Sequence, residues 1–207
     1  MNNNDEKKIK VAITHGDING VGYEVILKTF GDSRMFDFCT PVLYGSTKVA
    51  SYHKKLLASM PQEMQFVGIR DAVEAQDGKF NVINLTQDEI KIDLGKSTEV
   101  AGALSRESLN RACADLKAGK VDVLVTAPIN KRNIQAPDFD FPGHTEYLSH
   151  QFGSSSLMLM VCDRIRIGIV TNHLALKDVP NALTHNLLFD KMMLLNESLK
   201  RDFCITR

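Results

Sequence analysis

The chain has 207 residues, of which 43% are hydrophobic and 24% charged, so it can form one large or two small domains with a substantial core. Its 25 Lys and Arg balance its 25 Asp and Glu, which argues against nucleic-acid binding through phosphate neutralisation. Apolar runs are too short to span a membrane, and the start resembles no signal peptide. Four scattered cysteines without a C-x-x-C motif favour a cytoplasmic protein with reduced thiols.

Short β-rich runs alternate with helical patterns, which is typical of a sheet covered by helices. The polar residues 1–8 are expected to be flexible, and the α/β part to occupy residues 9–207. The first half is predicted to contain a strand at Ile9 to Thr14, a helix at Tyr23 to Phe30, a strand at Pro41 to Tyr44, a helix at Ser46 to Ser59 capped by its serine, and short strands at Gln65 to Ile69 and Phe80 to Leu85.

The next segment shows the strongest helical periodicity. A long helix is predicted to start near Ser97, with Gly119 as the residue that ends it. The run from Val121 to Thr126 is almost entirely apolar, which is typical of a strand buried on both faces.

Two further strands are predicted close together, at Leu157 to Cys162 and Ile165 to Thr171. Only two residues separate them, so we expect a hairpin and therefore a mixed sheet. A last helix, Thr184 to Arg201, is followed by no strand, so we expect the chain to be incomplete at its C-terminal end. Its inner face should carry Leu188, Met192, Leu195 and Leu199.

Candidate functional residues lie in loops at predicted strand ends, where open α/β sheets bind ligands. The loop from His15 to Gly22 contains three glycines and Asp17, and is either a ligand loop or a tight structural turn. Lys131 follows the Val121 to Thr126 strand, where its ammonium could reach a cleft or simply be solvated.

Two histidine-containing motifs follow. His144 lies beside a predicted helix start, where it could bind a phosphate, and Thr145 could instead be an ordinary N-cap. His173 directly follows a predicted strand and is either a metal ligand or a hydrogen-bonded interior histidine. The other histidines are interpreted as surface residues: His53, His150 and His185.

The segments GDINGVGYE, TAPINK, FPGHTEYL and VTNHLALKDV occur in this order. Together they resemble the 4-hydroxythreonine-4-phosphate dehydrogenase family of pyridoxal phosphate (vitamin B6) biosynthesis, over essentially the whole chain from Ile9. The resemblance implies an α/β fold like that of isocitrate and isopropylmalate dehydrogenases, with a mixed sheet, flanking helices and two domains around a cleft. We place the internal domain boundary near residues 120–140.

The resemblance implies NAD- or NADP-dependent oxidation of 4-phosphohydroxy-L-threonine, with decarboxylation to 3-amino-2-oxopropyl phosphate. It also implies a homodimer with the active site at the subunit interface. The balanced charge and the short apolar runs predict neither nucleic acid nor membrane as a partner. It assigns His144 and Thr145 to substrate binding and His173 to a divalent metal (Zn, Mg or Co). Lys131 and Asp17 are candidate catalytic residues because of their strand-end positions. Most cofactor-binding residues of the family would lie beyond Arg207.

Two departures from the family pattern bear on these expectations. Ile18, Asn19 and Tyr23 replace the Pro, Ala and second Pro of a GDPAGIGPE-like loop, which could reshape the loop while keeping its glycines. Family chains continue well beyond Arg207, so we expect a C-terminally truncated chain that is inactive alone and binds no stoichiometric metal. Two alternatives stay open: a paralogous 4-phospho-D-threonate or 4-phospho-D-erythronate dehydrogenase, and a non-catalytic truncated fragment.

Overall fold

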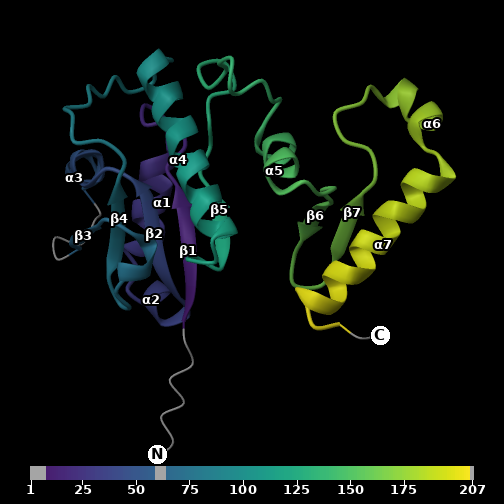
Figure 1. Ribbon diagram of the computed structural model, residues 1–207, viewed down its shortest axis with the longest axis horizontal. Coiled ribbons are helices and arrows are strands. Elements are labelled where there is room, and N and C mark those ends of the chain that lie inside the picture. The colour runs from purple at the N-terminus through teal and green to yellow at the C-terminus, as the bar shows by residue number, and fades with distance from the viewer. Residues whose placement is uncertain (1–7, 59–63, 206–207) are drawn as a thin grey trace, which may run out of the picture. The chain divides into compact units, whose positions relative to one another are not determined.

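The computed structural model describes residues 8–58 and 64–205, which form two compact units that divide between Phe152 and Gly153 (Figure 1). Most of the segment expected to be flexible, residues 1–8, lies outside the described residues. The first unit contains, in chain order, β1 (Ile9–Thr14), α1 (Gly22–Phe30), α2 (Met35–Phe38), β2 (Cys39–Gly45), α3 (Thr47–Leu56), β3 (Phe66–Ile69), a 3-10 turn (Ala72–Glu74), β4 (Phe80–Asn84), α4 (Glu99–Lys117), β5 (Val123–Thr126) and α5 (His144–Phe152).

The five strands of the first unit form one parallel sheet with the order β3-β4-β2-β1-β5. Each neighbouring pair is parallel, and β1 lies between β2 and β5, with Val11 opposite both Pro41 and Val123. The predicted alternation of strands and helices is therefore confirmed, because parallel neighbours need a crossover connection between them.

The sheet is covered on both faces, since successive side chains of a strand point to opposite sides. On one face, Ile13, Leu43 and Val82 pack against residues of α1 and α3. On the other face, Ala12 and Val42 belong to a cluster that includes residues of α4. The result is a three-layer α/β/α unit whose strand carboxyl ends all lie at one edge.

Local signals define the helix ends as the sequence predicts. The Ser46 side chain caps α3 by accepting a hydrogen bond from Val49 N, and Thr98 caps α4 in the same way. Gly119 follows α4 with φ of +67°, a conformation that glycine adopts without strain. These ends depend on side chains within a few residues, which is why the sequence alone locates them.

The expectation that both faces of the strand from Val121 to Thr126 are buried is wrong. β5 is an edge strand, and Val123 and Val125 are 42% and 52% exposed. Leu124, on the opposite side of the strand, packs against the clusters under α4. Within the described part of the chain, β5 has a neighbouring strand on one side only, so an apolar sequence here does not imply burial.

The second unit contains β6 (Met158–Val161), β7 (Arg166–Ile169), a 3-10 turn (Leu176–Asp178), α6 (Val179–Ala182) and α7 (His185–Arg201). The predicted hairpin is confirmed, because β6 and β7 pair antiparallel with Met158 opposite Ile169. The predicted mixed sheet is wrong: in the described residues the hairpin forms a two-stranded sheet of its own. A long connection between β5 and β6 carries the chain out of the parallel sheet before the hairpin begins.

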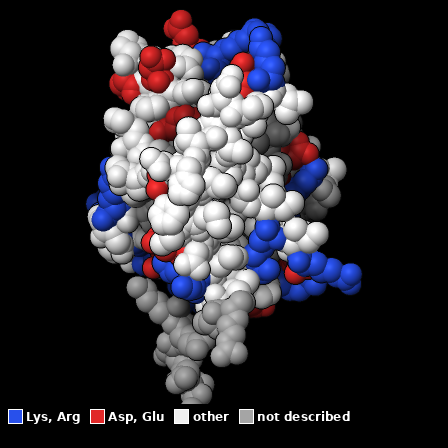
Figure 2. Space-filling model, turned by 90° about the vertical axis from the view of Figure 1, so that its right-hand side faces the viewer, with Lys and Arg blue, Asp and Glu red and all other residues white. Residues whose placement is uncertain are grey.

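α7 packs on the hairpin through only part of the face predicted, since Leu195 and Leu199 are half-buried but the other two predicted residues are exposed. A β-carbon on Gly168 would lie 3.5 Å from Leu195 Cδ2, so Leu195 covers the hairpin as expected. Leu188 and Met192, also expected inside, are 39% and 59% exposed. Part of the apolar surface of α7 is therefore exposed, including Phe189 and Met193. Figure 2 shows a broad area without Lys, Arg, Asp or Glu on one face of the molecule.

None of the helices in the described ranges is both long and apolar enough to cross a membrane.

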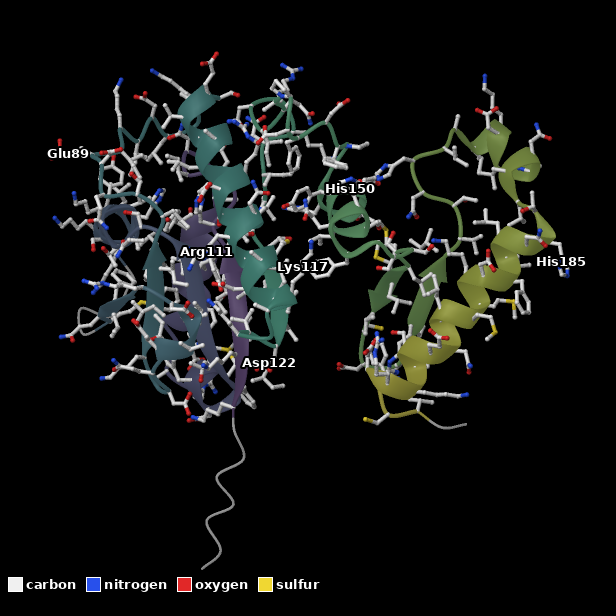
Figure 3. The ribbon with its side chains drawn as sticks, in the orientation of Figure 1. Glu89, Arg111, Lys117, Asp122, His150 and His185 are labelled. Atoms are coloured by element: carbon white, nitrogen blue, oxygen red, sulfur yellow. The ribbon has the colours of Figure 1, made fainter. Side chains whose placement is uncertain are left out.

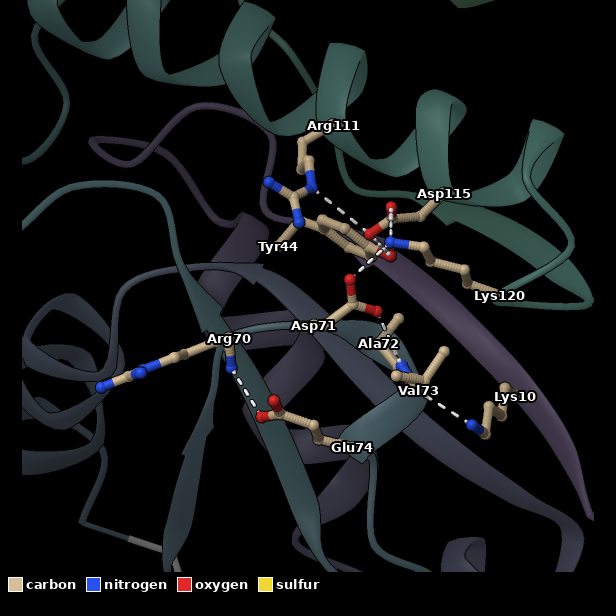
Figure 4. A network of polar contacts seen from close by, with 10 residues as sticks. All are labelled: Lys10, Tyr44, Arg70, Asp71, Ala72, Val73, Glu74, Arg111, Asp115 and Lys120. Carbon is tan, nitrogen blue, oxygen red and sulfur yellow. Dashed lines mark hydrogen bonds and ion pairs between the residues drawn. The ribbon is translucent and has the colours of Figure 1, made fainter.

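Asp115 is the centre of a buried polar network beside α4 (Figure 4). Its carboxylate accepts a hydrogen bond from the Tyr44 hydroxyl at 3.0 Å and forms ion pairs with Arg111 at 3.3 Å and Lys120 at 3.4 Å. Lys120 also pairs with Asp71. Because only 6% of the Asp115 side chain is exposed, these partners replace the water that it loses on folding.

Asp115→Ala is expected to lower the free energy of unfolding by about 2 kcal/mol, because the buried Tyr44 hydroxyl and two cations each lose a partner. Asp138→Ala is the matched control, since its ion pair with Arg106 is 3.7 Å long and its side chain is 71% exposed. The control should change the same quantity by less than about 1 kcal/mol. Urea unfolding followed by circular dichroism measures both, and equal effects would contradict the assigned role of Asp115.

Candidate functional site

The loop after β5 and the start of α5 bring Lys131 close to His144. A β-carbon built on Gly143 would lie 3.8 Å from Lys131 Cε and 3.7 Å from Glu146 Oε2. α5 begins at His144, directly after this glycine. The TAPINK and PGHTE segments therefore meet at the amino end of α5, with an ammonium, an imidazole and a carboxylate within reach of the same backbone position.

His144 carries an unpartnered polar atom at this position. Its Nε2 is buried and makes no hydrogen bond within the described part of the chain. Burial lowers the pKa of His144 below its usual value, and the positive charge of Lys131 lowers this pKa further. The imidazole is thus neutral at pH 7, and a neutral imidazole can donate one hydrogen bond and accept another. Nε2 is available to an oxygen of a bound ligand.

Thr145 lies inside the first turn of α5, so the interpretation of this residue as an N-cap is wrong. Tyr147 N donates to Gly143 O at 3.3 Å, which makes Gly143 the capping residue. Glycine has no side chain with which to bond the N–H groups of the first turn, and such groups attract anions. The substrate-binding role of Thr145 stays a prediction.

Asp17 is buried within the glycine loop and supports its shape. Its Oδ1 accepts a hydrogen bond from Asn19 N at 2.8 Å, and its Oδ2 accepts one from Asn133 Nδ2 at 3.1 Å. Asp17 N donates to Pro128 O at 2.9 Å. A β-carbon on Gly16 would lie 2.1 Å from that same oxygen, so only glycine allows this approach. The loop after β1 is therefore attached to the loop after β5.

A stack of three aromatic rings packs against the glycine loop, and two of the rings contact its backbone carbonyls. Tyr23 lies between His15 and His53, with ring centroids 5.4 and 5.1 Å apart. The His15 Nδ1 lies 2.7 Å from Gly16 O, and the His53 Nε2 lies 2.9 Å from Ile18 O. Since a carbonyl only accepts, each of these nitrogens carries the proton of a neutral imidazole.

Burial controls the protonation of this stack. It lowers the pKa of His15 to about 4 and lowers the pKa of His53 as well. His53 is 4% exposed, so its interpretation as a surface residue is wrong. Its neighbours in sequence are polar, but α3 turns this one position toward the loop. The other two, His150 and His185, are exposed as expected (Figure 3).

Asn19, one of the departures from the family pattern, connects the glycine loop to the segment before α4. Its Nδ2 donates to Lys96 O and to Thr98 Oγ1, both at 3.0 Å, and its Oδ1 accepts from Asp93 N at 2.9 Å. Its carbonyl oxygen also accepts from Gly95 N at 2.8 Å. The side chain is fully hydrogen-bonded, so Asn19 has a structural role that sequence reasoning missed, because its partners lie more than seventy residues away.

His173 lies in the second unit, in the loop after β7. Its φ of +55° is uncommon for a residue other than glycine, although histidine adopts it more often than most residues. No group of three or more His, Cys, Asp or Glu side chains in the described ranges could hold a metal ion. A metal site needs about three protein ligands. The donor set described here therefore does not fit a metal site, and the assignment of His173 as a metal ligand stays a prediction.

The first unit thus brings together most of the residues singled out in the sequence. Lys131 and His144 meet at α5, and Asp17 contacts the same loop that carries Lys131. Sequence reasoning missed Asn133, which joins Asp17 to that loop, and Glu146 beside Gly143. The pattern TAPINK indicated the loop but not which of its polar residues contact the glycine loop.

Comparison with known proteins gives a consistent family. Residues 37–207 match the family model described as "Pyridoxal phosphate biosynthetic protein PdxA". The chain is 43% identical over 203 residues to the 4-hydroxythreonine-4-phosphate dehydrogenase of Bacteroides thetaiotaomicron, covering 97% of this chain and 55% of that protein. It is 31% identical over 169 residues to the D-threonate 4-phosphate dehydrogenase of Cupriavidus necator, covering 81% of this chain and 50% of that protein.

A crystal structure of a 4-hydroxythreonine-4-phosphate dehydrogenase from Burkholderia phymatum has the same fold. The TM-score is 0.82 at 29% identity, over 93% of this chain and 58% of that one. The chain thus spans between half and three-fifths of the length of these proteins.

Proposed function

This chain belongs to the PdxA family of pyridoxal phosphate biosynthetic proteins, and on that premise we propose that it is part of an NAD(P)-dependent dehydrogenase acting on 4-phosphohydroxy-L-threonine. The observation that carries the proposal is the buried Nε2 of His144, which has no hydrogen-bond partner among the described residues and lies near Lys131 at the start of α5. The 43% identity to a 4-hydroxythreonine-4-phosphate dehydrogenase supports this substrate over the substrates of paralogous dehydrogenases.

In the proposed reaction the secondary alcohol of the substrate loses a hydride to NAD(P)⁺ and a proton to solvent, and the resulting β-keto acid loses CO₂ to give 3-amino-2-oxopropyl phosphate. When bound, the nicotinamide ring takes up the hydride. The chain's own residues bind and orient: the Lys131 ammonium attracts an anionic group of the substrate, and His144 Nε2 with Thr145 binds its oxygens. Asp17 is a second candidate for a charged group near the reacting atoms.

The proposal extends to the assembly of the complete enzyme. We propose a cytoplasmic homodimer whose active site lies at the subunit interface, with a divalent metal (Zn, Mg or Co) and His173 as one of its ligands. The support is family membership; the described residues by themselves supply no complete set of metal ligands.

The alternative substrate is 4-phospho-D-threonate or 4-phospho-D-erythronate, which the 31% identity to a D-threonate 4-phosphate dehydrogenase supports. Calorimetric titration of the purified chain with each phosphorylated acid distinguishes the two candidate substrates. Tighter binding of 4-phosphohydroxy-L-threonine supports the proposal, tighter binding of 4-phospho-D-threonate favours the paralogue, and binding of neither contradicts both.

With NAD⁺ and added Mg²⁺ or Zn²⁺, we expect no measurable turnover by this chain alone. A turnover rate of about 1 s⁻¹ or more would contradict that expectation.

His144→Ala is expected to weaken binding of the phosphorylated substrate about tenfold or more, because a charged or polar ligand oxygen loses a desolvated partner. In an active enzyme this change should raise KM more than it lowers kcat, since anchoring is lost before chemistry. His150→Ala is the matched control, because His150 is exposed on the same helix. Equal binding by both variants would contradict the role of His144.

A further inference from the structure

The long connection between β5 and α5 links the two groups that the proposed function assigns to the phosphorylated substrate. Lys131 lies near the start of this connection, and His144 directly follows its last residue. A connection of this length that moved freely would let the two groups adopt many separations, and a ligand would have to order them on binding. Contacts that hold the connection in one shape therefore determine how well the two groups are placed before a ligand arrives.

Gln135 joins the two ends of this connection. Its side-chain Nε2 donates to the carbonyl oxygen of Lys131 at 3.2 Å and to that of Phe141 at 3.0 Å. Phe141 stands directly before the Pro-Gly pair that precedes His144. Because a carbonyl only accepts, both partners need the NH₂ group of the amide, which defines its orientation. One side chain thus connects the backbone of Lys131 to the segment that leads into α5.

The backbone on either side of Gln135 is itself held in place. Ile134 is fully buried, and its carbonyl oxygen accepts a hydrogen bond from Arg106 Nη1 of α4 at 2.9 Å. Ala136 exchanges two backbone hydrogen bonds with Phe139, at 3.2 and 2.9 Å. The Gln135 side chain therefore extends from a fixed base, and its hydrogen bonds locate the two carbonyls relative to α4.

The exposure of Gln135 separates its effect on geometry from its effect on stability. Exposed hydrogen bonds contribute little to the free energy of unfolding, because water replaces them when they are lost. They still restrict where a backbone segment lies. Loss of the Gln135 amide should therefore alter the placement of the two substrate-binding groups more than the stability of the chain.

We propose that Gln135 is a positioning residue, which holds Lys131 and His144 at the separation that a phosphorylated substrate needs. It acts through the backbone of these two groups and does not touch the ligand. The two groups already lie close together in the structure, because a β-carbon on Gly143 would lie 3.8 Å from Lys131 Cε. The inference rests on the proposed function, since the two groups positioned are those proposed to bind the substrate.

Calorimetric titration with 4-phosphohydroxy-L-threonine compares the unaltered chain with Gln135→Met, whose side chain has a similar shape but cannot donate. We expect the affinity to fall about fivefold, because the substrate must now order the connection that Gln135 held. Gln76→Met, at an exposed position in the turn before β4, is the matched control and should leave the affinity unchanged. The melting temperatures of both variants should stay within about 4 °C of that of the unaltered chain.

A second measurement needs no ligand and distinguishes positioning from a general structural role. Burial lowers the pKa of His144, and the positive charge of Lys131 lowers it further. If Gln135→Met lets the two groups separate, the pKa of His144 should rise toward its usual value, which its imidazole NMR signal reports. The imidazole signal of the exposed His185, in the other unit, is the internal control and should titrate identically in both proteins.

Unchanged affinity in Gln135→Met would overturn the proposal. Weaker binding with an unchanged pKa of His144 would overturn it too, since Gln135 would then act by other means. The outcome is separable from that of the proposed function. A chain that binds neither phosphorylated acid but shows the pKa change at His144 loses the function and keeps the positioning of the two groups. A chain that binds 4-phosphohydroxy-L-threonine equally well with and without the Gln135 amide does the reverse.

Discussion

Gly102→Ala is expected to lower the free energy of unfolding by about 3 kcal/mol or more. A β-carbon at this position of α4 would lie 1.7 Å from the carbonyl oxygen of Asn133 and 2.4 Å from its carbonyl carbon. Both contacts are with backbone, so either the helix or the loop after β5 must move. Alanine favours a helix over glycine by only about 1 kcal/mol, which cannot offset the clash.

Gly20→Ala is the control, since its new β-carbon would come no closer than 3.4 Å to Asp17 O. We expect the control to change the free energy of unfolding, measured in urea, by less than about 0.5 kcal/mol. Displacement of Asn133 in the Gly102 variant should also remove its hydrogen bond to Asp17 and shift the backbone NMR signals of the glycine loop. Equal free energies of unfolding for the two variants would contradict the prediction, because they would show that the loop after β5 moves aside at little cost.

Lowering the pH from 7 to 4 is expected to cost about 3 kcal/mol of stability through His15 alone. Burial lowers the pKa of this histidine in the folded chain to about 4, against 6.5 when it is exposed. Between these values the unfolded chain binds the proton and the folded chain does not, so stability rises with pH over this range. Protonation would also leave a buried charge beside His53, although Asp17 attracts it.

The test compares the pH dependence of unfolding in the unaltered chain with that of His15→Gln, which cannot titrate. The difference between their free energies of unfolding should shrink by about 3 kcal/mol between pH 7 and pH 4. His150→Gln, at an exposed position, serves as the control and should leave the dependence unchanged. Parallel curves for all three proteins would show that His15 is not the group responsible.

Elements defined by neighbouring residues could be predicted from the sequence. Three such features follow from side chains only a few residues away: the bounds of β1, the serine cap of α3 and the glycine that ends α4. Burial could not be predicted in the same way. Val125 is apolar but lies on an edge strand, and Met192 is apolar but lies beyond the reach of the hairpin, since burial depends on which distant segment covers a residue.

At the candidate site, too, features set by neighbouring residues could be predicted, and features set by distant segments could not. Strand-end position singled out Lys131, and the family resemblance assigned His144 to substrate binding; the fold places the two close together. The roles of Asn19 and His53 escaped prediction, because each depends on a partner contributed by another part of the chain. A polar residue in a loop and a histidine in a polar helix are ordinary in sequence, and only the packed structure distinguishes them.

The central position of β1 has a consequence for folding during synthesis. One edge of this strand pairs with β2, about thirty residues later, but the other edge pairs Val11 with Val123. At about 5–20 residues per second, a ribosome needs roughly 6–22 seconds to make the intervening chain. During that time the nascent protein presents an unpaired edge beside apolar side chains, which is the kind of surface that chaperones cover.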